Sequence, residues 1–128
     1  MVNLVEPALP PDKPCVLIDY PAPAAALARL QSGNKRVAER WEVYIGGLEI
    51  ANAYSELIDA SEQRHRFETA AQERSNAGRD VYPMDERFMQ ALEQGLPECG
   101  GIALGVDRLI MLLCDTMQIS DVRVDVDG

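Results

Sequence analysis

The sequence is poor in the residues that build disulfide frameworks, zinc sites and hydrolytic triads. It holds a single histidine, His65, and three cysteines without CxxC spacing. A disulfide framework or a structural zinc site is therefore not expected, and cysteine usage of this kind indicates a reduced, cytoplasmic setting. Neither a signal peptide nor an apolar run near the roughly 20 residues of a membrane helix is visible. We expect no membrane contact.

Positive charge is also scarce. The 128 residues carry 12 Lys and Arg against 21 Asp and Glu, a net charge of -9. This balance argues against a surface built to bind nucleic-acid phosphates, although an enzyme can meet RNA through another domain. With 47% hydrophobic residues, the chain has enough apolar surface for one modest globular core.

The N-terminal half predicts a lead-in followed by strands. Residues 1–14 are Pro-rich and irregular, and residues 15–20 form a short apolar run typical of a buried strand. Residues 37–45 alternate between apolar and polar, and residues 48–57 follow directly after Gly46-Gly47. Two strands joined by Gly-Gly favour a hairpin, because glycine supplies the positive φ of a tight primed turn.

The C-terminal half predicts helices around one more strand. A polar helix is expected from about 60 to 76, capped by Asp59, and a second from about 85 to 95. Small residues at 100–105 indicate a strand or turn before an apolar helix that starts at Asp107, and residues 122–126 alternate as a closing strand would. This order predicts an α+β domain, an antiparallel sheet with flanking helices.

Two hairpin carboxylates are candidate metal ligands. In a two-residue turn Tyr44 faces Glu49 and Glu42 faces Ala51, so Glu42 and Glu49 are diagonal neighbours roughly 7–8 Å apart. Mg²⁺ takes one or two carboxylates plus substrate oxygens, so this pair beside a phosphate could hold it. The alternative is a solvated sheet face with ordinary surface acids.

A polar trio follows on the second strand of the hairpin. Asn52, Tyr54 and Glu56 recur at period two, and a carboxylate with an amide and a phenol suits a substrate ammonium group. An outward polar face is the equal alternative. Strict alternation puts the trio on the opposite face from Glu49, so one site that uses both sets needs a β-bulge.

A glycine-rich segment leads into the apolar helix. Gly101-x-x-x-Gly105 allows close approach of a ligand, and Arg108 lies in the first helical turn, where it could clamp phosphate or stack on a base. As a bare pattern it favours an ordinary strand-to-helix turn. However, residues 101–111, GIALGVDRLIM, resemble motif 3 of class II aminoacyl-tRNA synthetases. Residues 41–59, WEVYIGGLEIANAYSELID, resemble the lysyl-type signature upstream of it.

The resemblance extends over most of residues 15–128 and implies the C-terminal portion of a lysyl-tRNA synthetase-like catalytic domain. It implies ATP and Mg²⁺ as cofactors, with lysine or β-lysine as substrate. The residues it points to are the metal ligands Glu42 and Glu49, the nucleotide contacts Glu49, Ile50, Gly101, Gly105 and Arg108, and the substrate contacts Asn52, Tyr54, Glu56 and Ala103. Arg108 carries the catalytic role, since it matches the arginine that packs on adenine and reaches the γ-phosphate.

Two branches of that family compete. Lysyl-tRNA synthetases charge tRNA, whereas a shortened paralogue lysylates elongation factor P. The chain is more similar to the paralogue, most sharply at Ala103, where true lysyl enzymes usually have glycine. The added methyl could tune the pocket toward β-lysine; a neutral exchange is the alternative.

The family's motif 1 and motif 2 are not recognisable, and the chain opens at a point that resembles the interior of the catalytic domain. We therefore expect the chain alone to be inactive in adenylation. A non-catalytic module that self-associates through surfaces left uncovered is the second hypothesis, and a homo-oligomer is expected.

Overall fold

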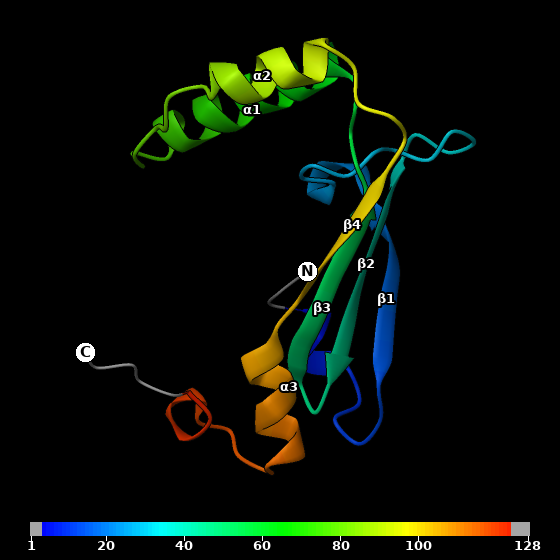
Figure 1. Ribbon diagram of the computed structural model, residues 1–128, viewed down its shortest axis with the longest axis vertical. Coiled ribbons are helices and arrows are strands. Elements are labelled where there is room, and N and C mark those ends of the chain that lie inside the picture. Colours follow the sequence, from blue (N-terminus) through cyan, green and yellow to red (C-terminus); the bar gives the residue numbers. More distant parts are fainter. Residues whose placement is uncertain (1–3, 124–128) are drawn as a thin grey trace.

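The architecture is a four-stranded antiparallel sheet with helices on one side. A computed structural model describes residues 4–123 (Figure 1). The strands lie in the order β1 (Cys15–Pro21), β2 (Val37–Ile45), β3 (Leu48–Ser55) and β4 (Gly100–Leu104). Each strand pairs with the next strand in the chain, and two helices lie between β3 and β4. The predicted α+β class is confirmed.

The turn between β2 and β3 is the predicted glycine hairpin. Gly46 and Gly47 have φ of +60° and +76°, the two positive values that a type I′ turn requires. Ile45 pairs with Leu48 and Tyr44 with Glu49, as expected. Beyond that point the register shifts, and Val43 pairs with Ala51. Ile50 is therefore an extra residue on β3, a β-bulge.

The bulge corrects one predicted pairing. Glu42 pairs with Asn52 rather than with Ala51. Because one inserted residue reverses which side of the sheet the following side chains occupy, Glu49 and Asn52 share a face instead of lying on opposite faces. Strict alternation could not reveal this, since nothing in residues 48–52 marks the bulge.

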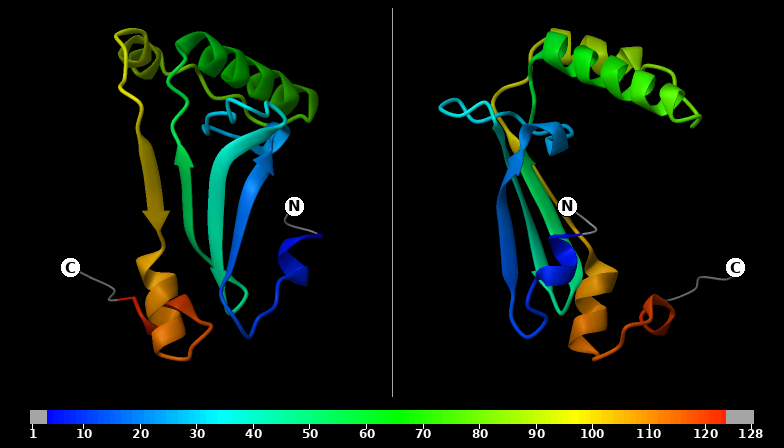
Figure 2. Two further views of the ribbon diagram at one scale, coloured as in Figure 1. Left: turned by 90° about the vertical axis from the view of Figure 1, so that its right-hand side faces the viewer. Right: turned by 180° about the vertical axis from the view of Figure 1, so that it is seen from behind.

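The helices follow the expected order. α1 (Ala60–Asn76) is capped by Asp59, which accepts a hydrogen bond from the backbone N–H of Glu62 at 3.0 Å. α2 (Glu86–Glu93) packs antiparallel to α1 in a helical hairpin that stands off one end of the sheet (Figure 2). Arg64 pairs with Glu86 at 2.9 Å across it, and Phe67 meets Phe88 at 6.1 Å between ring centroids.

The C-terminal region departs from two expectations. α3 (Val106–Leu113) has Gly105 at its N-cap and receives no side-chain cap, so Asp107, the expected start of the helix, lies within its first turn. Residues 119–121 form a 3₁₀ turn, and Val122 is its C-cap, not the start of a strand. The rest of the predicted strand 122–126 lies outside the described residues. Two further 3₁₀ turns span Glu6–Ala8 and Ala22–Ala24.

The two faces of the sheet have opposite character. All the helices lie on one side, together with a small buried cluster of Tyr20, Ala25, Ala28 and Ala38 (Figures 1 and 2). The other face carries apolar side chains that remain exposed: Val16, Ile18, Trp41, Ile102 and Leu104. No helix within residues 4–123 is long and apolar enough to cross a membrane.

Candidate functional site

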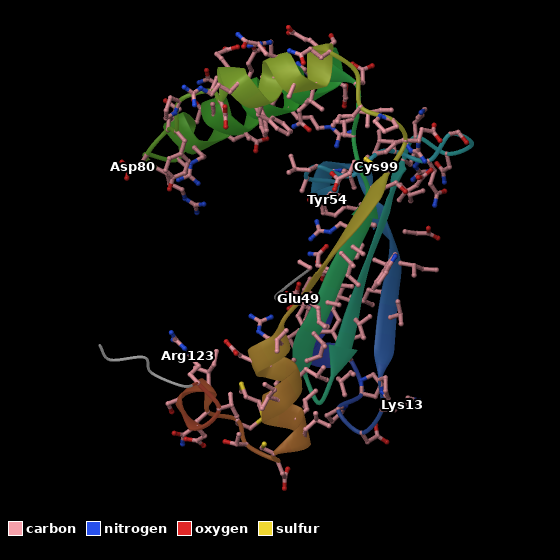
Figure 3. All side chains as sticks on the ribbon, viewed as in Figure 1. Lys13, Glu49, Tyr54, Asp80, Cys99 and Arg123 are labelled. Atoms are coloured by element: carbon pink, nitrogen blue, oxygen red, sulfur yellow. The ribbon has the colours of Figure 1, made fainter. Side chains whose placement is uncertain are left out.

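The predicted site residues gather on the helix-bearing face of the sheet. The bulge at Ile50 puts Glu49 on the same face as Asn52, and Arg40, Glu42 and Tyr44 lie opposite them on β2. Figure 3 shows the labelled Glu49 and Tyr54 on the side of the sheet where α3 and the helical hairpin lie. Two separately predicted groups, the acids and the polar trio, thus meet on one surface.

β4 completes this surface from the other side. Asn52 pairs with Ala103 and Tyr54 with Gly101, so the motif 3 segment runs directly beside the polar trio. A pocket of about 520 Å³ opens here, lined by Glu49, Asn52, Tyr54, Glu56, Gly101, Ile102 and Ala103. Six of these seven residues were predicted from the sequence as site residues.

Gly101 makes room for a carboxylate. A Cβ built on Gly101 would lie 3.0 Å from Oε1 of Glu56, so the Glu56 side chain occupies the space that a larger residue would take. The Glu56 backbone N–H donates to the Cys99 carbonyl at 2.9 Å, which ties the end of β3 to the start of β4. A negative charge therefore stands at one end of the pocket, suited to a cationic group of a ligand.

Arg108 stands at the other end, on the first turn of α3. Its Nη1 donates to the Glu49 backbone carbonyl at 2.8 Å and lies 3.8 Å from the Glu49 carboxylate. The Arg108 side chain is still 49% exposed, so about half of it is accessible to a ligand. The Gly105 N–H donates to the Ile50 carbonyl at 2.9 Å, so the bulge holds the start of the helix against β3.

Ile50 is placed differently from expectation. It was expected to lie against a nucleotide, but the residue is only 4% exposed. Its contribution in the described chain is structural, because its carbonyl anchors Gly105 and its insertion shifts the register. Ile50 has this low exposure because neighbouring side chains cover the bulge.

Glu42 is the most heavily hydrogen-bonded side chain of the surface. It is 5% exposed. Its Oε1 accepts from Arg40 Nη2 at 2.6 Å and from Asn52 Nδ2 at 2.9 Å. Its Oε2 accepts from the Tyr44 hydroxyl at 2.6 Å and from the Tyr20 hydroxyl. A carboxylate offers about four acceptor positions, so all of them are occupied.

These contacts also set the ionisation of the cluster. Burial raises the pKa of Glu42, but hydrogen bonds from Tyr20 and Tyr44 and the charge of Arg40 outweigh it, so the net pKa lies below the ordinary value. Burial, followed by the hydrogen bond to Glu42, raises the pKa of both Tyr20 and Tyr44. Glu42 is thus a carboxylate and the two tyrosines are neutral donors at pH 7.

The geometry supports only one of the two expected metal ligands. Glu49 fits: its side chain is 37% exposed and its charged contact, with Arg108, is long at 3.8 Å. Glu42 does not fit, because a cation would have to displace a protein donor and sit close to the Arg40 guanidinium. Within residues 4–123 no group of three or more His, Cys, Asp or Glu side chains is arranged to hold a metal.

Sequence reasoning missed the donors around Glu42. Arg40 and Tyr44 recur with Glu42 at period two, a spacing that could have indicated one shared strand face. Tyr20 comes from β1, where the register shifts between Ile18 and Tyr20, and Asp19 has a φ of +57°. That irregularity turns Tyr20 toward Glu42, and no local pattern predicts it.

Comparison with known proteins identifies the family of the chain. The family model described as tRNA synthetases class II (D, K and N) matches residues 10–124. Three relatives named elongation factor P–(R)-beta-lysine ligase are similar to the chain. The protein from Proteus mirabilis is 53% identical over 94% of the chain, that from Pectobacterium atrosepticum 51% over 92%, and that from Avibacterium paragallinarum 49% over 92%.

The chain spans 36–37% of the length of these relatives, so only part of each relative is matched. Within that part the similarity includes both predicted signatures, residues 41–59 and 101–111, and the strands that carry them. The chain therefore belongs to the class II tRNA synthetase family of the D, K and N type.

Proposed function

We propose that this chain carries part of the ATP and amino-acid site of a ligase that activates lysine or β-lysine for transfer to elongation factor P. One observation carries the proposal: the Ile50 bulge puts Glu49 on the same face as Asn52, between Arg108 and the pocket lined by Glu56. The names of the relatives support the choice of acceptor. Transfer to tRNA is the alternative within the family.

The pocket is proposed to hold the amino acid. Glu56 would pair with an ammonium group, while Asn52 and Tyr54 would supply polar contacts along the same strand face. Ala103 lies directly across from Asn52, so its methyl group borders the pocket. This position supports the hypothesis that Ala103 helps to select β-lysine over lysine.

The opposite end is proposed to hold the nucleotide. Arg108 would contact the adenine and γ-phosphate, with Gly101 and Gly105 keeping the backbone of motif 3 open beside it. Glu49 would hold Mg²⁺ together with phosphate oxygens, since Mg²⁺ is commonly bound through one or two carboxylates and its substrate. The bound ion would neutralise phosphate charge during attack by the amino-acid carboxylate.

The reaction proposed for the complete site is adenylation. The substrate carboxylate attacks the α-phosphorus of ATP, which forms an aminoacyl-adenylate and releases pyrophosphate. Such catalysis rests on positioning and on stabilisation of phosphate charge, and loss of one preorganised donor typically costs about 3–4 kcal/mol. No arginine is among the described residues that line the pocket, and Arg108 stands beside it through its contacts with Glu49. We predict that this chain alone has no useful adenylation rate, either in the cytoplasm or in vitro.

Calorimetric titration of the pure chain with ATP–Mg²⁺ tests the nucleotide half. We expect weak binding that is lost in Arg108→Ala. Arg87→Ala is the matched control, because it removes the same charge from an exposed first-turn position of α2. Equal heats from the wild type and Arg108→Ala would refute the placement of the nucleotide. Lysine-dependent ATP–pyrophosphate exchange at a robust rate would refute the predicted inactivity.

A second candidate is a non-catalytic module that self-associates. The exposed apolar face favours it, since Val16, Ile18, Ile102 and Leu104 are each more than half exposed and gather on one side of the sheet. Sedimentation velocity of the wild type and of Ile18→Lys tests this candidate. Concentration-dependent dimers that disappear in the variant would support self-association through this face, whereas a monomeric wild type would exclude it.

A further inference from the structure

The deepest contact of the site is a carboxylate surrounded by four donors from three strands. Glu42 lies on β2, Tyr20 on β1 and Asn52 on β3, so the cluster joins three adjacent strands through side-chain hydrogen bonds. Arg40 is itself fixed, because its Nη1 donates to the Ala24 carbonyl at 2.8 Å and its guanidinium lies 4.6 Å from the centre of the Tyr20 ring. Such a cluster holds its members in one arrangement.

The Asn52 amide gains a defined orientation from this cluster. A side-chain amide has one donor end and one acceptor end, and an ionised carboxylate can only accept. With Asn52 Nδ2 donating to Glu42 Oε1 at 2.9 Å, rotation of the amide by half a turn would bring two acceptor oxygens together. The Asn52 carbonyl oxygen must therefore be the end turned away from Glu42.

That carbonyl oxygen has no hydrogen-bond partner in the described protein, although it is buried. A buried acceptor without a partner is destabilising, and a ligand that supplies an N–H donor removes that penalty. The residues beside it reinforce the same preference, because Glu49 and Glu56 in the pocket lining are also acceptors. The polar groups on this side thus match an ammonium group and repel a carboxylate.

We propose that Glu42 is a positioning residue rather than a metal ligand, and that it fixes Asn52 so that its carbonyl oxygen accepts a hydrogen bond from a ligand ammonium group. The orientation of the amide stands on the structure alone. The ammonium ligand rests on the proposed function, so the two parts are tested by separate measurements.

The side-chain amide of Asn52 reports directly on the orientation. In ¹H–¹⁵N spectra of the chain its signals are assigned by their loss in Asn52→Ala. We expect one amide proton shifted downfield, with contacts to the Glu42 γ-protons that persist at millimolar Mg²⁺. In Glu42→Gln the downfield shift should disappear, while Tyr44→Phe should retain it, because Tyr44 donates to the other carboxylate oxygen.

The metal alternative gives the opposite pattern. If Mg²⁺ alone removes the contacts between the Asn52 amide and the Glu42 γ-protons in the wild-type chain, Glu42 binds the ion and the proposal is overturned. A shift of the Asn52 signals with these contacts retained is expected from an ion at the neighbouring Glu49 and supports the proposal. This arm needs no variant and survives a Glu42→Gln chain that fails to fold. An unchanged Asn52 signal in a folded Glu42→Gln chain also overturns it.

The ligand is tested with L-lysine against 6-aminohexanoate, which keeps the side-chain ammonium proposed for Glu56 but lacks the α-ammonium; Asn52 lies four residues from Glu56 on an extended strand, roughly 13 Å away. We expect lysine to shift the Asn52 signals and 6-aminohexanoate to leave them unchanged, with lysine affinity about tenfold weaker in Glu42→Gln, the factor that 1.4 kcal/mol represents. If the wild type binds neither amino acid, the proposed function fails while the spectra still decide the orientation. If lysine binds equally well to both chains, the positioning role fails.

Discussion

Removal of a single hydroxyl, in Tyr44→Phe, tests the Glu42 cluster as a source of stability. Tyr44 is 4% exposed and its hydroxyl donates to Glu42 Oε2 at 2.6 Å. A hydrogen bond to a charged group contributes about 1.5–3 kcal/mol, so we expect the free energy of unfolding at pH 7 to fall by about 2 kcal/mol. For a small domain with a total of about 5 kcal/mol or more, that loss is readily measured.

The loss should depend on pH in a defined direction. The pKa of Glu42 is lowered in the folded chain, by its hydrogen bonds from Tyr20 and Tyr44 and by Arg40 against the opposing effect of burial. A lowered folded pKa gives stability that is present above the unfolded pKa and is lost as pH falls through the folded pKa. Tyr44→Phe raises the folded pKa of Glu42 toward its ordinary value, so the variant has less to lose on acidification. Its deficit should stay constant down to about pH 4, near the ordinary glutamate pKa, and shrink as pH falls further.

Urea unfolding followed by the fluorescence of Trp41 measures both quantities. The unfolding slope should be unchanged, which would show that the variant alters stability and not compactness. Tyr82→Phe is the matched control, because Tyr82 is 71% exposed and its hydroxyl makes no hydrogen bond within residues 4–123. A Tyr44→Phe chain as stable as Tyr82→Phe at pH 7, or a deficit that stays constant as pH falls below about 4, would refute the account of the cluster.

Three further predictions concern the same surface and its supports. The pKa values of Tyr20 and Tyr44 are raised, first by burial and then by Glu42. The stability that these two groups contribute is therefore fully present below their ordinary pKa and is lost as pH rises. In an alkaline titration, their phenolate absorbance should appear only as the chain unfolds. Gly46→Ala and Gly47→Ala should each lower the free energy of unfolding by about 1 kcal/mol, because each position needs a left-handed backbone. Gly46→Ala should have the lower melting temperature, because its Cβ would lie 2.9 Å from Leu112 Cδ2. Equal melting temperatures would contradict this. Gly101→Ala should displace the Glu56 carboxylate and weaken lysine binding, whereas Gly105→Ala, whose Cβ would be 3.4 Å from Arg108 Cδ, should leave lysine binding intact; calorimetry on both variants decides.

The sequence by itself determined the local elements and the chemical character of the site. The Gly46-Gly47 turn and the cap at Asp59 are short-range signals, and the structure confirms both because each depends only on residues close in the chain. The family was also readable from residues 41–59 and 101–111, since these segments combine two specific patterns in the expected order. Asn52 and Glu56 could be predicted to lie on one face of the same strand, because they recur at period two along it.

Only the tertiary structure decided how those residues combine. The bulge at Ile50 reverses the face of the following residues, and it is set by pairing with β2 and β4 rather than by its own sequence. Trp41 belongs to a residue type that is highly buried on average, yet it is 36% exposed because the face it occupies is bare in the described chain. The role of Glu42 depended on Tyr20, 22 residues away and turned by the irregularity at Asp19. A carboxylate looks alike in any sequence; whether it is free to bind a metal ion or already surrounded by donors depends on contacts between distant strands, and those exist only once the chain has folded.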